Sequence, residues 1–172
     1  MSRSRPNFLV TGTPGVGKTT FSGMMAARFN MLHIPVSRLI AEKHLWHEKD
    51  EQRDCTIYDE QLLDDEIQKI LSENSEGGVI FDFHCTDIVP SECIDYVLVL
   101  RCDSDILYKR LQQRNYDPKK ITENVDAEIF RVVLDEVIDD FPQEMIKEIS
   151  SDTMADLDHA LDMVGELLSM SH

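Results

Sequence analysis

The segment at residues 12–20, Gly-Thr-Pro-Gly-Val-Gly-Lys-Thr-Thr, limits the folds open to this chain more than any other feature. It matches the phosphate-binding pattern G-x-x-x-x-G-K-[ST], follows the apolar run Phe8–Val10 and precedes a helical pattern. Gly15 and Gly17 let the backbone turn with positive φ, so that successive N–H groups face phosphate oxygens. The segment predicts a strand–loop–helix unit that binds a nucleoside triphosphate.

Two side chains of this loop have the chemistry to act on the bound phosphates. Lys18 has the length to reach the β- and γ-phosphates, and the Thr19 hydroxyl can hold Mg²⁺. The positive end of the helix that follows adds to the attraction. We therefore expect a triphosphate and its metal ion at this loop.

The rest of the chain alternates short apolar runs with helical patterns. Phe8–Thr11, Val79–Phe83 and Tyr96–Leu100 are nearly all apolar, as expected of strands buried on both faces. Met31–Ile34 and Met145–Ser150 are weaker candidates, and the second has the polar content of an edge strand. This order predicts a three-layer α/β/α sandwich of the P-loop NTPase type, with about five mainly parallel strands.

The helical patterns begin after the phosphate loop and continue to the carboxyl end. Apolar spacing predicts helices at 59–73, from 103 or 104 onward, and from 152 or 153 onward. A further stripe runs from Ile129 to Phe141 and ends near Pro142. We interpret these stripes as core-facing surfaces.

Length and composition bound the class of protein. At 172 residues, 42% of them hydrophobic, the chain is expected to form one domain over 1–172. It lacks an apolar stretch of membrane-spanning length and a signal peptide, so we expect an unsecreted protein without membrane contact. Its four cysteines have no CxxC spacing, which favours reduced thiols and fits cytosol or nucleus.

An acidic residue ends the apolar run at 79–82. Asp82 in this position suits a carboxylate near the Mg²⁺ shell. His84, two residues on, points the same way by the strand period. It could orient a nucleophile or sense the γ-phosphate, or simply hydrogen-bond the end of the loop.

Six of the 17 basic residues fall between 101 and 120. Arg110 and Arg114 are four residues apart on one predicted helix face, and Arg114 leads into a turn at 115–118. Phosphoryl transfer needs guanidinium groups on the developing charge and a site closed to water. We expect a short lid at about 113–122, with a plain amphipathic helix edge as the alternative.

The segment from about 35 to 58 is too polar and charged to be core. We expect it to close over a second substrate. Arg38 and Arg53 are its available cations for a monophosphate acceptor, and Trp46 either stacks on a base or anchors the loop.

The net charge of −16 is concentrated at the carboxyl end, where residues 121–172 carry −12. Such a field opposes strong general binding to nucleic acid and suits a basic partner such as a ribosomal protein. The alternative is a set of solvated helix faces.

With these residues assembled, the chain resembles the adenylate kinase isoenzyme 6 family, also described as coilin-interacting nuclear ATPases. The similarity runs from about Pro6 to Ser169. It rests on the segments Gly12–Thr20, Asp59-Glu60, Asp82-Phe83-His84, Val99–Asp103, Leu107-Tyr108, Arg110-Leu111, Arg114-Asn115-Tyr116 and Asp126–Ile129.

The resemblance implies an adenylate-kinase-like fold with a short lid, transfer of the ATP γ-phosphoryl to AMP or a related monophosphate, and ATP hydrolysis. It also implies a role in small ribosomal subunit maturation through a basic small-subunit ribosomal protein, in nucleus and cytoplasm. Lys18, Asp82, His84 and Arg114 would be catalytic. Nucleotide contacts would come from Gly15, Val16, Gly17, Lys18, Thr19, Thr20 and Arg114, and Mg²⁺ contacts from Thr19 and Asp82.

One position departs from the family pattern. Ala41 stands where relatives often have a basic residue, and Arg38 or Lys43 are the possible replacements. Three hypotheses follow: an adenylate kinase with slow ATPase activity, an assembly factor switched by ATP, and a kinase for a non-nucleotide metabolite.

Overall fold

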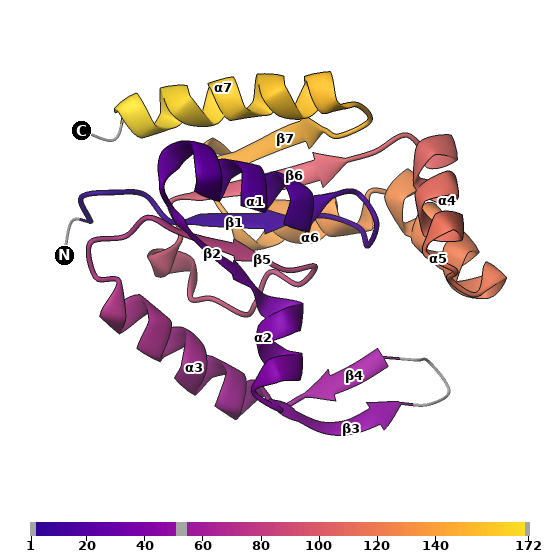
Figure 1. The fold of residues 1–172 in the computed structure, drawn as a ribbon, viewed down its shortest axis with the longest axis horizontal. Helices are drawn as coiled ribbons and strands as arrows, with labels where there is room; N and C mark the ends of the chain where they lie inside the picture. Colours follow the sequence, from indigo (N-terminus) through magenta and orange to yellow (C-terminus); the bar gives the residue numbers. More distant parts are fainter. Residues whose placement is uncertain (1–2, 51–54, 171–172) are drawn as a thin grey trace.

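The computed structural model describes residues 3–50 and 55–170, without the side chains of residues 48–50, 55 and 56. Figure 1 shows a sheet between two layers of helices. None of the described helices combines the length and the apolar character needed to cross a bilayer. The strands are β1 (Phe8–Thr11), β2 (Leu32–Pro35), β3 (Trp46–Asp50), β4 (Cys55–Tyr58), β5 (Val79–Asp82), β6 (Tyr96–Arg101) and β7 (Ile146–Ser150). The α-helices are α1 (Lys18–Phe29), α2 (Val36–Glu42), α3 (Glu60–Glu73), α4 (Ser104–Gln113), α5 (Pro118–Ile129), α6 (Val132–Asp140) and α7 (Met154–Met170).

Five parallel strands form the main sheet, in the order β2-β5-β1-β6-β7. Strand β1 lies at its centre, with Val10 opposite Asp82 on one side and Leu98 on the other. The strands β1 and β5 are buried throughout, as their apolar sequences predict. The predicted three-layer fold is confirmed, and β7 lies at an edge as expected.

The core has two halves, one on each face of the sheet. Because successive strand residues point to opposite faces, Phe8 and Val10 pack beneath α1 and α7, whereas Leu9 packs against α2, α3 and α6. The two layers hold the central strands rigidly. All the parallel strands end at one edge, where the phosphate loop begins.

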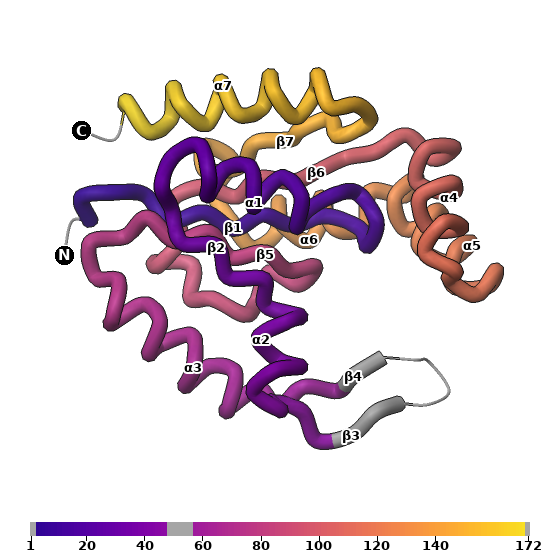
Figure 2. Tube along the Cα trace, in the orientation of Figure 1, coloured from indigo at the N-terminus to yellow at the C-terminus, as the bar shows by residue number. Residues whose placement is uncertain are grey.

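Between α2 and α3 the chain forms an antiparallel hairpin of β3 and β4, with Trp46 opposite Tyr58. Figures 1 and 2 show this hairpin projecting away from the sheet beyond the end of α2. The sequence predicts a polar segment here that closes over a substrate. The two strands were not predicted, because the many polar residues hide the alternation of a strand.

Two details differ from the sequence predictions. The stripe from Ile129 to Phe141 is not one helix: α5 ends at Ile129, Arg131 takes a left-handed φ of 60°, and α6 starts at Val132. As a result Ile129 and Phe130 are exposed, with 57% and 73% of their surface accessible. The predicted turn at 115–118 leads directly into α5, whose first turn is capped by the Asp117 side chain.

Candidate functional site

The phosphate loop joins β1 to α1, and its glycines are required by its shape. Gly15 has φ of 96°, and a Cβ there would lie 2.7 Å from a Leu111 methyl and 2.9 Å from a Leu107 methyl of α4. Gly17 has φ of 102° and caps α1, with open space around it. Position 15 therefore needs glycine for both conformation and space, and position 17 for conformation alone.

Lys18 lies across this loop. Its ammonium donates hydrogen bonds to the carbonyls of Gly12, at 2.8 Å, and Thr13, at 3.2 Å. Burial of the ammonium lowers the pKa of Lys18 from 10.5 to about 8, against the opposing effect of the Asp82 carboxylate. A negatively charged phosphate bound beside the Lys18 ammonium would favour its protonated form and so oppose the effect of burial.

Asp82 joins three elements at the end of β5. Its carboxyl group is buried, and its Oδ2 accepts a 2.7 Å hydrogen bond from the Thr19 hydroxyl. The Nε2 of His33, on β2, lies 3.2 Å from the same oxygen. Thr19 and Asp82 therefore meet, as their predicted metal-binding role requires. His33 was missed because β2 is a weak pattern in which a lone histidine carries no signal.

His84 follows two residues after Asp82 and is exposed. Its ring lies 4.4 Å from the ring of the buried Phe83, centroid to centroid. Partial burial and the nearby Lys18 ammonium lower the pKa of His84, which keeps the ring neutral near pH 7. Its part in catalysis stays a prediction.

A second buried carboxylate was also missed. Glu128, on α5, accepts a 2.5 Å hydrogen bond from the Thr13 hydroxyl of the phosphate loop. It also accepts one of 2.6 Å from Arg101 Nε and one of 3.1 Å from the Cys102 N–H. An acid on a polar, exposed-looking helix gives no sequence signal for such burial.

The two arginines predicted to share a lid face differ in their surroundings. Arg110 donates to the carbonyls of Ser151, at 2.7 Å, and Asp152, at 3.0 Å, so it braces the loop after β7. Arg114 caps the end of α4 with its backbone N–H, and its side chain is exposed. Its positive charge lowers the pKa of Lys18, so it lies near the phosphate loop. The lid role of Arg114 stays a prediction.

The residues near the expected acceptor site are mostly exposed. Arg38 lines a hollow of about 320 Å³ together with His33, Ile34, Pro35, Leu39 and Glu42. Its Nε donates a 2.6 Å hydrogen bond to Glu42, one turn along α2. Lys43, the other possible replacement for a basic residue at position 41, is bonded to Glu66. Arg53 lies outside the described residues, and Trp46 is partly exposed beside the His44 ring.

The remaining predicted nucleotide contacts lie around the loop. Val16 is buried, and its carbonyl accepts a 2.7 Å hydrogen bond from the Ser151 hydroxyl. Thr20 is exposed in the first turn of α1. Of the six consecutive residues 15–20, Gly15 and Val16 are buried, Gly17 and Lys18 are partly exposed, and Thr19 and Thr20 are exposed.

Comparison with known proteins matches this geometry. A family model described as "AAA domain" matches residues 9–131, which contain the phosphate loop, Asp82 and Arg114. The solved structure of shikimate kinase from Bacteroides thetaiotaomicron has a TM-score of 0.62 over 95% of this chain and 98% of that chain, at 17% identity. At that identity the likeness shows the fold alone, the three-layer α/β/α arrangement of P-loop NTPases.

Curated relatives narrow the family. The adenylate kinase isoenzyme 6 homolog of Caenorhabditis elegans is 39% identical over 96% of this chain and 91% of its own length. That of Dictyostelium discoideum is 38% identical, over 96% and 93%. The homolog FAP7 of Saccharomyces cerevisiae is 36% identical, over 90% and 78%. The chain belongs to the adenylate kinase isoenzyme 6 family.

Proposed function

We propose that this protein is a Mg²⁺-dependent adenylate kinase that transfers the γ-phosphoryl of ATP to AMP or a related nucleoside monophosphate, and that it also hydrolyses ATP slowly. Lys18 and the loop amides would bind the donor phosphates, and Arg114 would neutralise charge on the transferred group. Positioning and charge neutralisation do the work, without a covalent enzyme intermediate.

The observation that carries the proposal is that one residue joins both substrate regions. His33 contacts the Asp82 carboxylate at 3.2 Å and also lines the hollow beside Arg38. A monophosphate in that hollow would therefore lie next to the γ-phosphate end of the loop. A site built for hydrolysis alone has no need of such a neighbouring hollow.

Thr19 and Asp82 fit the metal that this chemistry needs. Mg²⁺ prefers oxygen ligands and usually binds through one or two protein groups, with substrate phosphates and water completing the shell. The Thr19 hydroxyl and the Asp82 carboxylate are such groups, and they lie in contact. When held by Thr19 and Asp82, the ion would neutralise charge on the phosphates.

Product analysis with and without AMP tests the proposal. Two ADP formed for each ATP consumed, only when AMP is present, is the expected result. Phosphate release that AMP leaves unchanged would overturn the kinase assignment and leave hydrolysis. A panel of hydroxylated metabolites in place of AMP covers the remaining kinase class.

The acidic carboxyl region favours a second candidate function. Residues 121–172 carry a net charge of −12, which suits a basic partner. We infer that a basic small-subunit ribosomal protein recognises the ATP-bound state during maturation of that subunit, in nucleus and cytoplasm. Nucleotide-dependent, salt-sensitive capture of such a protein is expected, and capture indifferent to both would remove this candidate.

A further inference from the structure

Glu128 is a buried carboxylate that the proposed chemistry does not use. Only 3% of its surface is exposed, and both of its oxygens are occupied. Oε2 accepts from the Thr13 hydroxyl at 2.5 Å, and Oε1 accepts from Arg101 Nε and the Cys102 N–H. Burying a charge costs free energy unless it is paired, so this arrangement is a built feature.

On one side Glu128 fixes the phosphate loop. The residue it bonds, Thr13, offers its carbonyl to Lys18 Nζ at 3.2 Å and to the Val16 N–H at 3.3 Å. Thr13 is itself buried, with 1% of its surface exposed. A shift of Thr13 would therefore move the carbonyl on which Lys18 lies.

On the other side Glu128 belongs to the helix pair α4–α5, and Arg114 directly follows α4. Glu128 lies in the last turn of α5, and Figure 1 shows α5 packed beside α4, which ends at Gln113, one residue before Arg114. The Glu128 carbonyl accepts a further 3.0 Å hydrogen bond from Arg101. The carboxylate thus links α5 to the loop, while α4 contacts the loop separately through Arg110, whose Nη1 donates to the Val16 carbonyl at 3.4 Å.

We propose that Glu128 is a positioning residue that keeps the phosphate loop aligned with the α4–α5 pair, so that Arg114 meets the phosphoryl group held by Lys18. The inference rests on the proposed function, since it assigns Arg114 to that group. Glu128 touches no substrate in this scheme. Its effect reaches the reaction through Thr13 on one side and through Arg114 on the other.

A double-mutant cycle between Glu128 and Arg114 separates positioning from simple fold stability. Glu128→Gln in the otherwise unchanged chain should lower kcat about 10- to 100-fold, the order expected for misplacement of a catalytic group. In an Arg114→Ala background the same change should cost less than about threefold, because no guanidinium remains to be positioned. A residue that only stabilises the fold would cost the same in both backgrounds.

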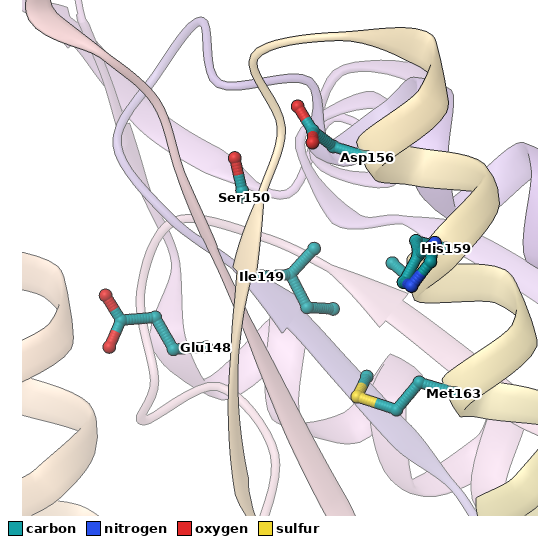
Figure 3. A pocket seen from close by; sticks show the side chains of 7 residues that line it. Glu148, Ile149, Ser150, Asp156, His159 and Met163 are labelled. Atoms are coloured by element: carbon teal, nitrogen blue, oxygen red, sulfur yellow. The ribbon is translucent and has the colours of Figure 1, made fainter.

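Glu148→Gln is the matched control. Glu148 pairs with the same Arg101, at 3.1 Å, but does not contact the phosphate loop. Glu148 lies on β7 and helps to line a hollow of about 270 Å³. Figure 3 shows its carboxylate directed away from His159 and Met163, which line the same hollow. This variant should keep kcat within about twofold, as expected for a half-exposed ion pair.

Thr13 tests the same contact from the loop side if Glu128→Gln folds poorly. Thr13→Val removes the hydroxyl donor and leaves the Arg101 and Cys102 contacts in place. It should lower kcat in the same direction as Glu128→Gln, while Thr13→Ser, which keeps the hydroxyl, should stay near the parent rate. Equal losses for Val and Ser would contradict the role of this hydrogen bond.

Two outcomes would overturn the inference: an equal cost of Glu128→Gln in both backgrounds, or an Arg114→Ala variant with unchanged turnover. ATP consumption is followed with and without AMP, so the cycle can be read on ADP or on released phosphate. A wild-type chain that hydrolyses ATP without transfer would overturn the proposed function and leave the test of Glu128 intact. A wild-type chain without turnover would overturn both.

Discussion

The two substrate regions of this protein differ in how much of their chemistry is already arranged. Around the phosphate loop, Lys18 donates to two loop carbonyls at 2.8 and 3.2 Å, and the Thr19 hydroxyl donates to Asp82 at 2.7 Å. On the acceptor side, Arg38 is 73% exposed in its side chain and pairs with Glu42 of its own helix. The donor side is preorganised, whereas at the proposed acceptor side Arg38 would have to leave Glu42 to bind a monophosphate.

This difference has a physical cause. The loop connects the buried central strand β1 to α1, and its buried polar groups must be paired within the protein. The α2 helix and the β3–β4 hairpin project from the sheet, where water satisfies polar groups and ion pairs contribute little. A donor site that is fixed and an acceptor site that adapts suit an enzyme that must exclude water before transfer.

The sharpest test of the contrast is removal of one lysine from each side. Lys18→Ala should lower kcat by at least about 10²- to 10³-fold, because a preorganised charge on the reacting phosphates is lost. Lys43→Ala, which removes an ammonium paired with Glu66, should change kcat by less than about twofold. Steady-state kinetics with ATP and AMP would measure both, and comparable losses would contradict the division into two regions.

The donor side was the more predictable part of the molecule. Glycine spacing and the lysine specify the loop at residues 12–20, and the acid that ends the apolar run at 79–82 marks the second strand of the site. His33 and Glu128 could not be predicted, because each reaches the site only through tertiary packing. Their contacts with Asp82 and Thr13 join positions 49 and 115 residues apart.

The prediction of secondary structure was wrong where a local sequence signal had two interpretations. Asp117 before Pro118 suits a turn, but it also suits a helix start with proline in the first turn, which is what the structure has. The apolar stripe from Ile129 onward continues across Arg131, which has a left-handed backbone conformation and separates two helices. Such a conformation is usually marked in a sequence by glycine, and here it is not. The apolar runs of β1, β5 and β6 had a single interpretation, and they were correct.

Adding side-chain atoms at one position of each region tests how rigid that region is. Gly15→Ala should lower the free energy of unfolding by roughly 2–4 kcal/mol, since a positive φ is strained for alanine and the new Cβ meets Leu111 at 2.7 Å. Ala41→Arg adds a whole side chain at an exposed position of α2 and should stay within about 0.5 kcal/mol. Urea denaturation with m-values compared would show both, and an equal cost at the two sites would break the contrast.

Substitutions in the Arg38–Glu42 pair should change the KM for AMP, whereas removal of the Asp82 carboxylate should change turnover. Arg38→Ala should raise KM for AMP roughly tenfold, as for loss of a charge-assisted hydrogen bond. Glu42→Gln should lower that KM by up to about twofold, because it frees Arg38 from a surface pair. Asp82→Asn on the donor side should instead reduce turnover. A Glu42→Gln variant that binds AMP as poorly as Arg38→Ala would mean that Glu42 itself contacts the acceptor.

The smallest expected effect is the uptake of a proton by Lys18 when ATP binds. Burial lowers the pKa of Lys18 in the free protein to about 8, from an ordinary 10.5, so between these values the unfolded chain holds a proton that the native chain lacks. The contribution of this group to stability therefore rises with pH across that window. Phosphate favours the charged amine, so ATP affinity should fall as pH rises above about 8, and binding should take up a proton.

Calorimetry of Mg²⁺-ATP binding at pH 8.5, in two buffers that differ in ionisation enthalpy, would count this proton. Uptake of roughly three-quarters of a proton is expected from a pKa near 8. Lys18→Arg, which stays charged at this pH, should remove the uptake while keeping a cation in the loop. AMP binding should show none, because its expected cation is the exposed and permanently charged Arg38. Proton uptake with AMP but not with ATP would place the buried, titrating cation on the acceptor side and reverse the contrast between the two regions.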